Sequence, residues 1–179
     1  MSVFLTYYVI CLVVAAACTD FKRQKIPNIL TIPSVFVGLL GHVWLNGWQG
    51  LVFSVEGLGV GLGVLLGFYI LGGMAAGDVK LLGAIGAIVG PNEVFTVFLA
   101  TALLGGLYSL GMMLGLWGIM GTLHRIVTMF KTVVLTGTVS TAFSSSSDQP
   151  KLRYGLVIAL GALFVQFGHQ FGMLDLWRS

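Results

Sequence analysis

The sequence predicts an all-α, polytopic membrane protein with six transmembrane helices and one cytoplasmic amphipathic segment. Hydrophobic residues make up 57% of the 179-residue chain, charged residues make up 8%, and the mean hydropathy is +1.00. Soluble globular domains carry about a quarter charged residues, so this composition indicates burial in lipid. The apolar residues form continuous runs rather than alternating with polar ones, which argues against a transmembrane β-barrel.

Each span is predicted from an apolar stretch, because a bilayer core of roughly 30 Å requires about 20 helical residues. The stretches cover residues 3–17, 29–45, 51–71, 79–89, 94–120 and 154–171, and the fourth is short. Pro27 and Pro33 flank the start of the second, where a first helical turn tolerates proline. No second domain is visible, so we expect residues 1–179 to form one membrane-embedded domain.

Glycines are concentrated in the third and fourth spans. Their Gly-x-x-x-Gly spacings let helix backbones approach closely in lipid, so we predict tight packing of both helices. These glycines are Gly57, Gly59, Gly61, Gly63 and Gly67 in the third span and Gly83, Gly86 and Gly90 in the fourth.

The first span ends in small residues that resemble a cleavage site, but no positively charged residue precedes it, as one does in signal peptides. We therefore expect this span to remain as an anchor.

Cys11 and Cys18 lie seven residues apart on one helix face and form no Cys-x-x-Cys pair. A packing role is the expectation, rather than zinc binding or redox chemistry.

The cations predict the orientation of the chain in the membrane. Of the nine Lys and Arg residues, eight lie at the odd-numbered connections or their borders, and only Arg178 lies opposite. By the positive-inside rule those connections are cytoplasmic and both termini are external. The net charge of +3 suggests no nucleic-acid partner.

In the fifth connection the apolar residues recur at helical spacing, which predicts an interfacial helix over residues 123–131.

Two acids, Asp20 and Asp78, fall at the cytoplasmic ends of apolar stretches. The chain has only six Asp and Glu residues, and an ionisable group at membrane depth is functional by default because its burial is costly. Glycines in residues 72–77 disfavour a helix interior just before Asp78. We expect Ala75, Ala76 and Gly77 to expose backbone groups to a substrate there, and an ordinary connecting loop is the alternative.

Two facing carboxylates can hydrolyse a peptide bond without a metal or a covalent intermediate. Like-charge repulsion makes the pair share a proton, so one partner activates water while the other protonates the carbonyl oxygen. Each acid also has a structural interpretation: Asp20 can be interfacial beside Lys22 and Arg23, and Asp78 can pair with Lys80. Lys80 can tune Asp78 or anchor at the head groups. The three histidines are scattered and no His-Glu-x-x-His occurs, so no metal site is expected.

At these residues the chain resembles the aspartic type IV prepilin peptidases, especially the short branch that serves Flp or tight-adherence pili. The matching segments are Asp20 with Ile-Pro-Asn at residues 26–28, Gly-Asp-Val-Lys-Leu at 77–81, and Tyr-Gly at 154–155 leading into Ile-Ala-Leu-Gly at 158–161. The resemblance implies that Asp20 and Asp78 are catalytic. It also implies a bacterial inner-membrane protein without a cofactor.

The implied substrate is a prepilin-like membrane protein that is cut after a glycine at the cytoplasmic face. Ala75 stands where the family motif Gly-x-Gly-Asp has its first glycine, which puts full activity in doubt. Longer relatives carry a Cys-x-x-Cys segment and methylate the new N-terminus, so the likeness supports cleavage only. A small proton-coupled transporter and a catalytically silent pilus-assembly factor remain alternatives. Oligomeric state does not follow from the sequence.

Overall fold

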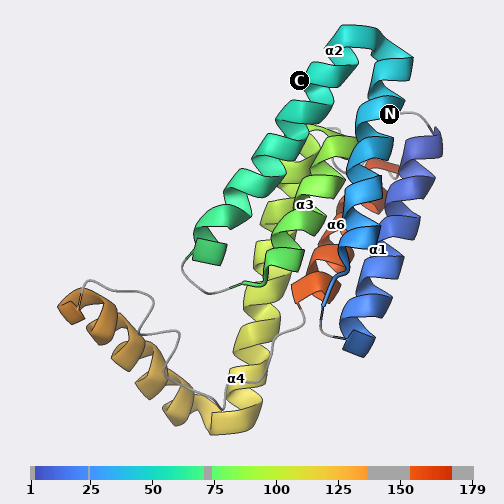
Figure 1. The fold of residues 1–179 in the computed structure, drawn as a ribbon. Coiled ribbons are helices and arrows are strands. Elements are labelled where there is room, and N and C mark those ends of the chain that lie inside the picture. Colours follow the sequence, from blue (N-terminus) through green and yellow to red (C-terminus); the bar gives the residue numbers. More distant parts are fainter. Residues whose placement is uncertain (1–2, 24, 71–73, 137–153, 171–179) are drawn as a thin grey trace.

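The computed structural model describes residues 3–23, 25–70, 74–136 and 154–170. Its elements are α1 (Val3–Arg23), α2 (Asn28–Ile70), α3 (Ala76–Val89), α4 (Pro91–Thr136) and α6 (Tyr154–Gln170) (Figure 1). Within those described ranges every regular element is a helix, which confirms the predicted all-α class.

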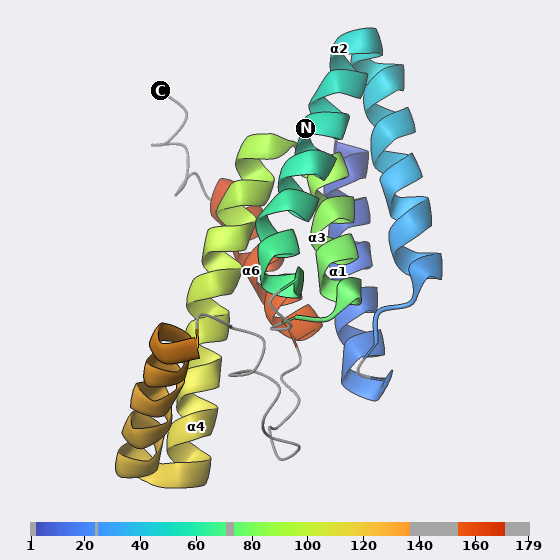
Figure 2. The same cartoon turned by 60° about the vertical axis from the view of Figure 1, so that its left-hand side comes forward.

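Two of these helices contain a break at a glycine. Gly47 has φ 59° and ψ −133°, a backbone conformation that favours glycine, and it divides α2 into two arms that run side by side (Figure 1). The arms cover the second and third predicted spans. Gly118, with φ 67°, interrupts α4 two residues before the predicted end of the fifth span, and the helix then turns away in a new direction (Figure 2).

Membrane character follows from the length and composition of the helices. Three segments are long and apolar enough to cross a bilayer: Val3–Lys22, Asn28–Ile70 and Pro91–Met112. The apolar part of α6, Tyr154–Gly168, is shorter. A helix therefore lies over each predicted stretch, whereas a count of six crossings stays a prediction.

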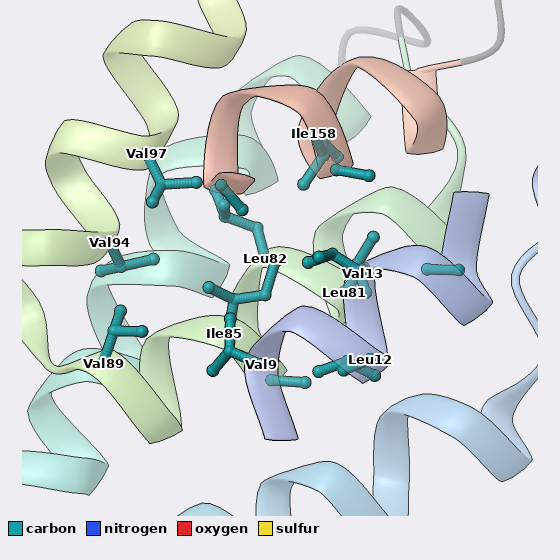
Figure 3. Close-up of a cluster of buried hydrophobic side chains, with 14 of the residues drawn as sticks. Val9, Leu12, Val13, Leu81, Leu82, Ile85, Val89, Val94, Val97 and Ile158 are labelled. Carbon is teal, nitrogen blue, oxygen red and sulfur yellow. The ribbon is translucent and has the colours of Figure 1, made fainter. Parts of the chain in front are cut away.

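Helix α3 forms the centre of the bundle. Every residue from Leu81 to Gly90 is buried, and α1, α2, α4 and α6 all contact this helix. Figure 3 shows Leu81, Leu82 and Ile85 among side chains of α1, α4 and α6. Large apolar side chains such as those of Leu103 and Phe164 point outward, as expected for surfaces that face lipid. The short helix that carries Asp78 is thus held from several sides.

Close backbone contact between α2 and α3 depends on only some of the predicted glycines. A Cβ atom on Gly57 would collide with the Gly86 carbonyl oxygen, and one on Gly61 would lie 2.6 Å from the Leu82 oxygen. By contrast, a Cβ on Gly59, Gly63 or Gly67 would meet nothing within 4 Å. The prediction of tight packing was right for one face of the helix and wrong for the other.

We expect Gly57→Ala to destabilise the bundle by about 1–3 kcal/mol, because the added methyl group overpacks a backbone contact that cannot yield easily. Gly59→Ala is the matched control two residues away. It adds the same methyl group to open space and should be neutral or slightly stabilising. Thermal unfolding of both variants in the same detergent tests this. Equal melting temperatures for the two variants would contradict the packing shown here.

Polar side chains of α2 cap the end of α3. The last carbonyl groups of a helix have no partner within the helix. His42 Nε2 donates to the Ile88 oxygen at 2.7 Å, and Ser54 Oγ donates to the Ala87 oxygen at 2.6 Å. Each arm of α2 supplies one donor, so the hairpin fixes α3 at the end opposite Asp78.

The predicted packing of the two cysteines was wrong. Cys11 and Cys18 share a face of α1, but both are exposed on the outside of the bundle. The inward face of α1 carries Leu5, Val9, Leu12, Val13 and Ala16 instead.

Candidate active site

Asp20 lies near the end of α1 and is 6% exposed. Its Oδ2 accepts a hydrogen bond from the backbone N–H of Leu156 in the first turn of α6, at 3.2 Å. The carboxylate therefore does not extend along the helix surface to solvent. This burial argues against a purely interfacial role for Asp20.

Asp78 lies in the first turn of α3 and is 5% exposed. Ala75 precedes the helix with extended φ −82° and ψ 147°, and its carbonyl oxygen accepts the Asp78 N–H at 3.0 Å. The helix begins at Ala76, so Ala76 and Gly77 are helical and not part of an irregular loop. Gly72 and Gly73 lie outside the described residues.

The two carboxyl groups interact electrostatically. Burial raises the pKa of Asp78 from its ordinary 3.8 to about 6, and the charge of Asp20 adds to this effect. A backbone hydrogen bond with Ala75 acts in the opposite direction. Asp78 precedes the predicted span 79–89 and takes part in none of the three long apolar helices. At pH values up to about 6 the pair can therefore hold one proton between its members.

Ile26 packs beside both acids. Its side chain is buried, and a Cβ atom on Gly77 would lie 3.2 Å from the Ile26 Cβ. A Cβ on Gly155 would lie 3.0 Å from the Ile26 Cδ1. The connection between α1 and α2 thus fits between the helix that carries Asp78 and the helix that contacts Asp20.

Lys80 is exposed, and its Nζ donates to Asn28 Oδ1 at 3.0 Å. This hydrogen bond joins α3 to the start of α2. Lys80 forms it in place of the ion pair with Asp78 that the sequence offered as an alternative. Ala75 and Ala76 are also exposed beside the buried Asp78. The start of α3 is therefore open to the surroundings just before the buried acid.

The chemistry of the site is that of two carboxyl groups. Among the residues that the structure describes, no group of three or more His, Cys, Asp or Glu side chains could hold a metal ion. Sequence reasoning missed the contribution of α6, because a backbone N–H donor has no residue type to mark it. The Tyr-Gly pair at 154–155 entered only through resemblance.

We expect Ala75→Gly to leave the activity of this site within about twofold of the wild type. Ala75 is exposed and has a backbone conformation that any residue adopts, so its methyl group strains nothing. At the position just before a helix, glycine is a better capping residue than alanine, so the substitution does not weaken the start of α3. The measurement is the rate of substrate cleavage by equal amounts of inserted protein. A large loss would show that the methyl group has a role at the site.

Comparisons with known proteins place these features in context. The model of the type IV leader peptidase family matches residues 7–110, which include both acids but not α6. A prepilin leader peptidase/N-methyltransferase of Aeromonas salmonicida is 34% identical over 108 residues, which cover 56% of this chain and 37% of that protein. The protein of the same name from Aeromonas hydrophila matches to the same extent. The match thus spans little more than a third of these relatives. No solved structure matched the chain.

Proposed function

This chain belongs to the type IV leader peptidase family, and from that premise we propose that it is a membrane aspartic endopeptidase acting on prepilin-like proteins. One observation carries the proposal: two buried carboxyl groups from different helices, Asp20 and Asp78, interact at one end of the bundle. Perturbed, coupled acids of this kind cluster at catalytic sites.

The reaction we propose is hydrolysis by a water molecule that the two acids activate. The ionised carboxylate takes a proton from water as its oxygen bonds to the scissile carbonyl carbon, while the protonated partner donates to the carbonyl oxygen. The proton held by the base then passes to the amide nitrogen, while the other carboxylate takes back a proton from a hydroxyl group of the tetrahedral intermediate. The carbon–nitrogen bond breaks, which leaves a new carboxylate and a new amine and restores the pair with its one proton. Neither step needs a metal or a covalent intermediate.

The proposed substrate has a short basic leader followed by an apolar helix, and it is cut after a glycine at the cytoplasmic face of the bacterial inner membrane. The exposed Ala75 and Ala76 lie beside buried Asp78, where an extended strand can meet backbone groups. We assign Gly77 and Lys80, both in the first turns of α3, as supports of this region, because Gly77 lies close to Ile26 and Lys80 donates a hydrogen bond to Asn28. We also propose that the enzyme serves Flp or tight-adherence pili. The same proposal has the chain cross the membrane six times, with both termini external.

The test is co-expression with candidate prepilins in cells that lack other such peptidases. Loss of the leader is followed as a gel shift and located by mass spectrometry. We expect cleavage directly after the leader glycine, and replacement of that glycine by a bulky residue in the substrate should block it. An inserted chain that leaves every prepilin of its own host uncut would refute the proposal. The expectation concerns cleavage alone and not N-methylation.

A further inference from the structure

We infer that the first turn of α6 is a third component of this site, in which Gly155 and the Leu156 N–H position the Asp20 carboxyl group for its interaction with Asp78. This inference rests on the proposed function for its catalytic meaning. Gly155 and Leu156 lie outside the region matched to the family, residues 7–110, whereas their partners Asp20 and Ile26 lie within it. These contacts can be tested without any substrate.

The hydrogen bond is the first observation. Helix α6 begins at Tyr154, so the Leu156 N–H is among the first donors of a helix, which have no carbonyl partner within it. Asp20 Oδ2 accepts this donor at 3.2 Å from another helix. The start of α6 therefore holds one oxygen of the Asp20 carboxyl group in place.

The missing side chain of Gly155 is the second observation. A Cβ atom there would lie 3.0 Å from the Asp20 Cγ and Oδ2 and 3.0 Å from the Ile26 Cδ1. Gly155 is not among the glycines with positive φ, so its role is close approach and not backbone freedom. Because this residue has no side chain, α6 can come near enough to Asp20 for the Leu156 N–H to reach it.

Ile26 connects this contact to the second acid. A Cβ atom on Gly155 of α6 would lie 3.0 Å from the Ile26 Cδ1, and one on Gly77, which directly precedes Asp78 on α3, would lie 3.2 Å from the Ile26 Cβ. Ile26 is therefore close to both glycines and lies between the helix that bonds to Asp20 and the helix that carries Asp78.

Other ionisable groups lie near the pair, among the residues whose side chains the structure describes. Tyr154, next to Gly155, interacts electrostatically with Asp78. Lys80 directs its ammonium group to Asn28, while Lys22 and Lys25 are exposed. Asp78 is the acidic group that interacts with Asp20 from α3.

Gly155→Ala is the test, with Gly161→Ala as the matched control on the same helix. A Cβ on Gly161 would lie 2.5 Å from the Thr101 Oγ1, so the control crowds α6 at least as strongly but away from both acids. In Gly155→Ala we expect kcat to fall about tenfold or more while KM stays unchanged, because the hydrogen bond that positions Asp20 is weakened. Gly161→Ala should yield less folded protein with a wild-type kcat per folded molecule. A wild-type kcat in Gly155→Ala, or the same fall in the control, would overturn the inference.

Hydrogen exchange supplies a readout that needs no cleavage. We expect exchange at residues 154–158 to speed up about tenfold in Asp20→Ala and to stay unchanged in Asp78→Ala, because only Asp20 accepts the Leu156 N–H. Equal protection in both variants would refute the contact even if the chain is a peptidase. If the contact holds and no prepilin is cut, the proposed function fails instead.

Discussion

Replacing either Asp20 or Asp78 by asparagine is expected to lower leader cleavage by at least about a thousandfold. Asparagine keeps the size of the side chain but can neither take a proton from water nor deliver one to the leaving amine. General acid–base catalysis contributes roughly 10²–10⁴-fold per positioned group, and here two groups share one proton. Loss of either acid therefore disables both steps of the proposed hydrolysis.

The measurement is leader removal from a co-expressed prepilin, normalised to the amount of each variant inserted in the membrane. Glu56→Gln is the control, because Glu56 is an exposed acid on α2 and belongs to no part of the site. It should cleave like the wild type. Normal processing by Asp20→Asn or Asp78→Asn, in cells without another such peptidase, would eliminate the carboxylate pair as the catalyst.

Apolar composition predicted much of the fold, because in lipid a long apolar stretch has few alternatives to a helix. The helices lie where the six stretches do. The two arms of α2 meet at Gly47, which lies in the gap between the second and third predicted stretches, so this break agrees with the prediction. The break at Gly118 was missed, because it lies inside the apolar stretch 94–120 and glycine also occurs within helices of this sequence.

Which face of a helix packs against the other helices was harder to predict than where the helix lies in the sequence. Gly57 and Gly59 are both glycines in one Gly-rich helix, yet only Gly57 meets the α3 backbone. Cys11 and Cys18 were expected to pack, yet they lie on the exposed side of α1. When both faces of a helix are apolar, hydrophobic periodicity cannot distinguish the core from the membrane, because both accept the same side chains.

The candidate site was partly predictable. Asp20 and Asp78 stood out because acids are rare in such a sequence, and the structure brings them into electrostatic interaction. Their catalytic role remains a proposal. The backbone donor of Leu156 and the position of Ile26 between two glycines could not be found from spacing, because they depend on how α6 returns to the end of α1.

The raised pKa of Asp78 predicts a second large effect, on stability. Burial and the charge of Asp20 favour the protonated form in the folded state, so between pH 3.8 and about 6 the folded protein binds more protons than the unfolded chain. Stability must then fall as pH rises through this window, and the loss is complete above pH 6. A pKa difference of about two pH units corresponds to roughly 3 kcal/mol.

Asp78→Asn should remove this loss, since asparagine does not ionise. We expect its free energy of unfolding to exceed that of the wild type by up to about 3 kcal/mol at pH 7 and to approach the wild-type value below the unfolded-state pKa of 3.8. Unfolding of both proteins in one detergent, from pH 3.5 to 7.5, measures the difference. Asp20→Asn should reduce the pH dependence only in part, because burial is the larger cause. Wild-type and Asp78→Asn curves that run parallel over this range would show that Asp78 ionises freely, and the shared proton on which the proposed hydrolysis depends would be lost with it.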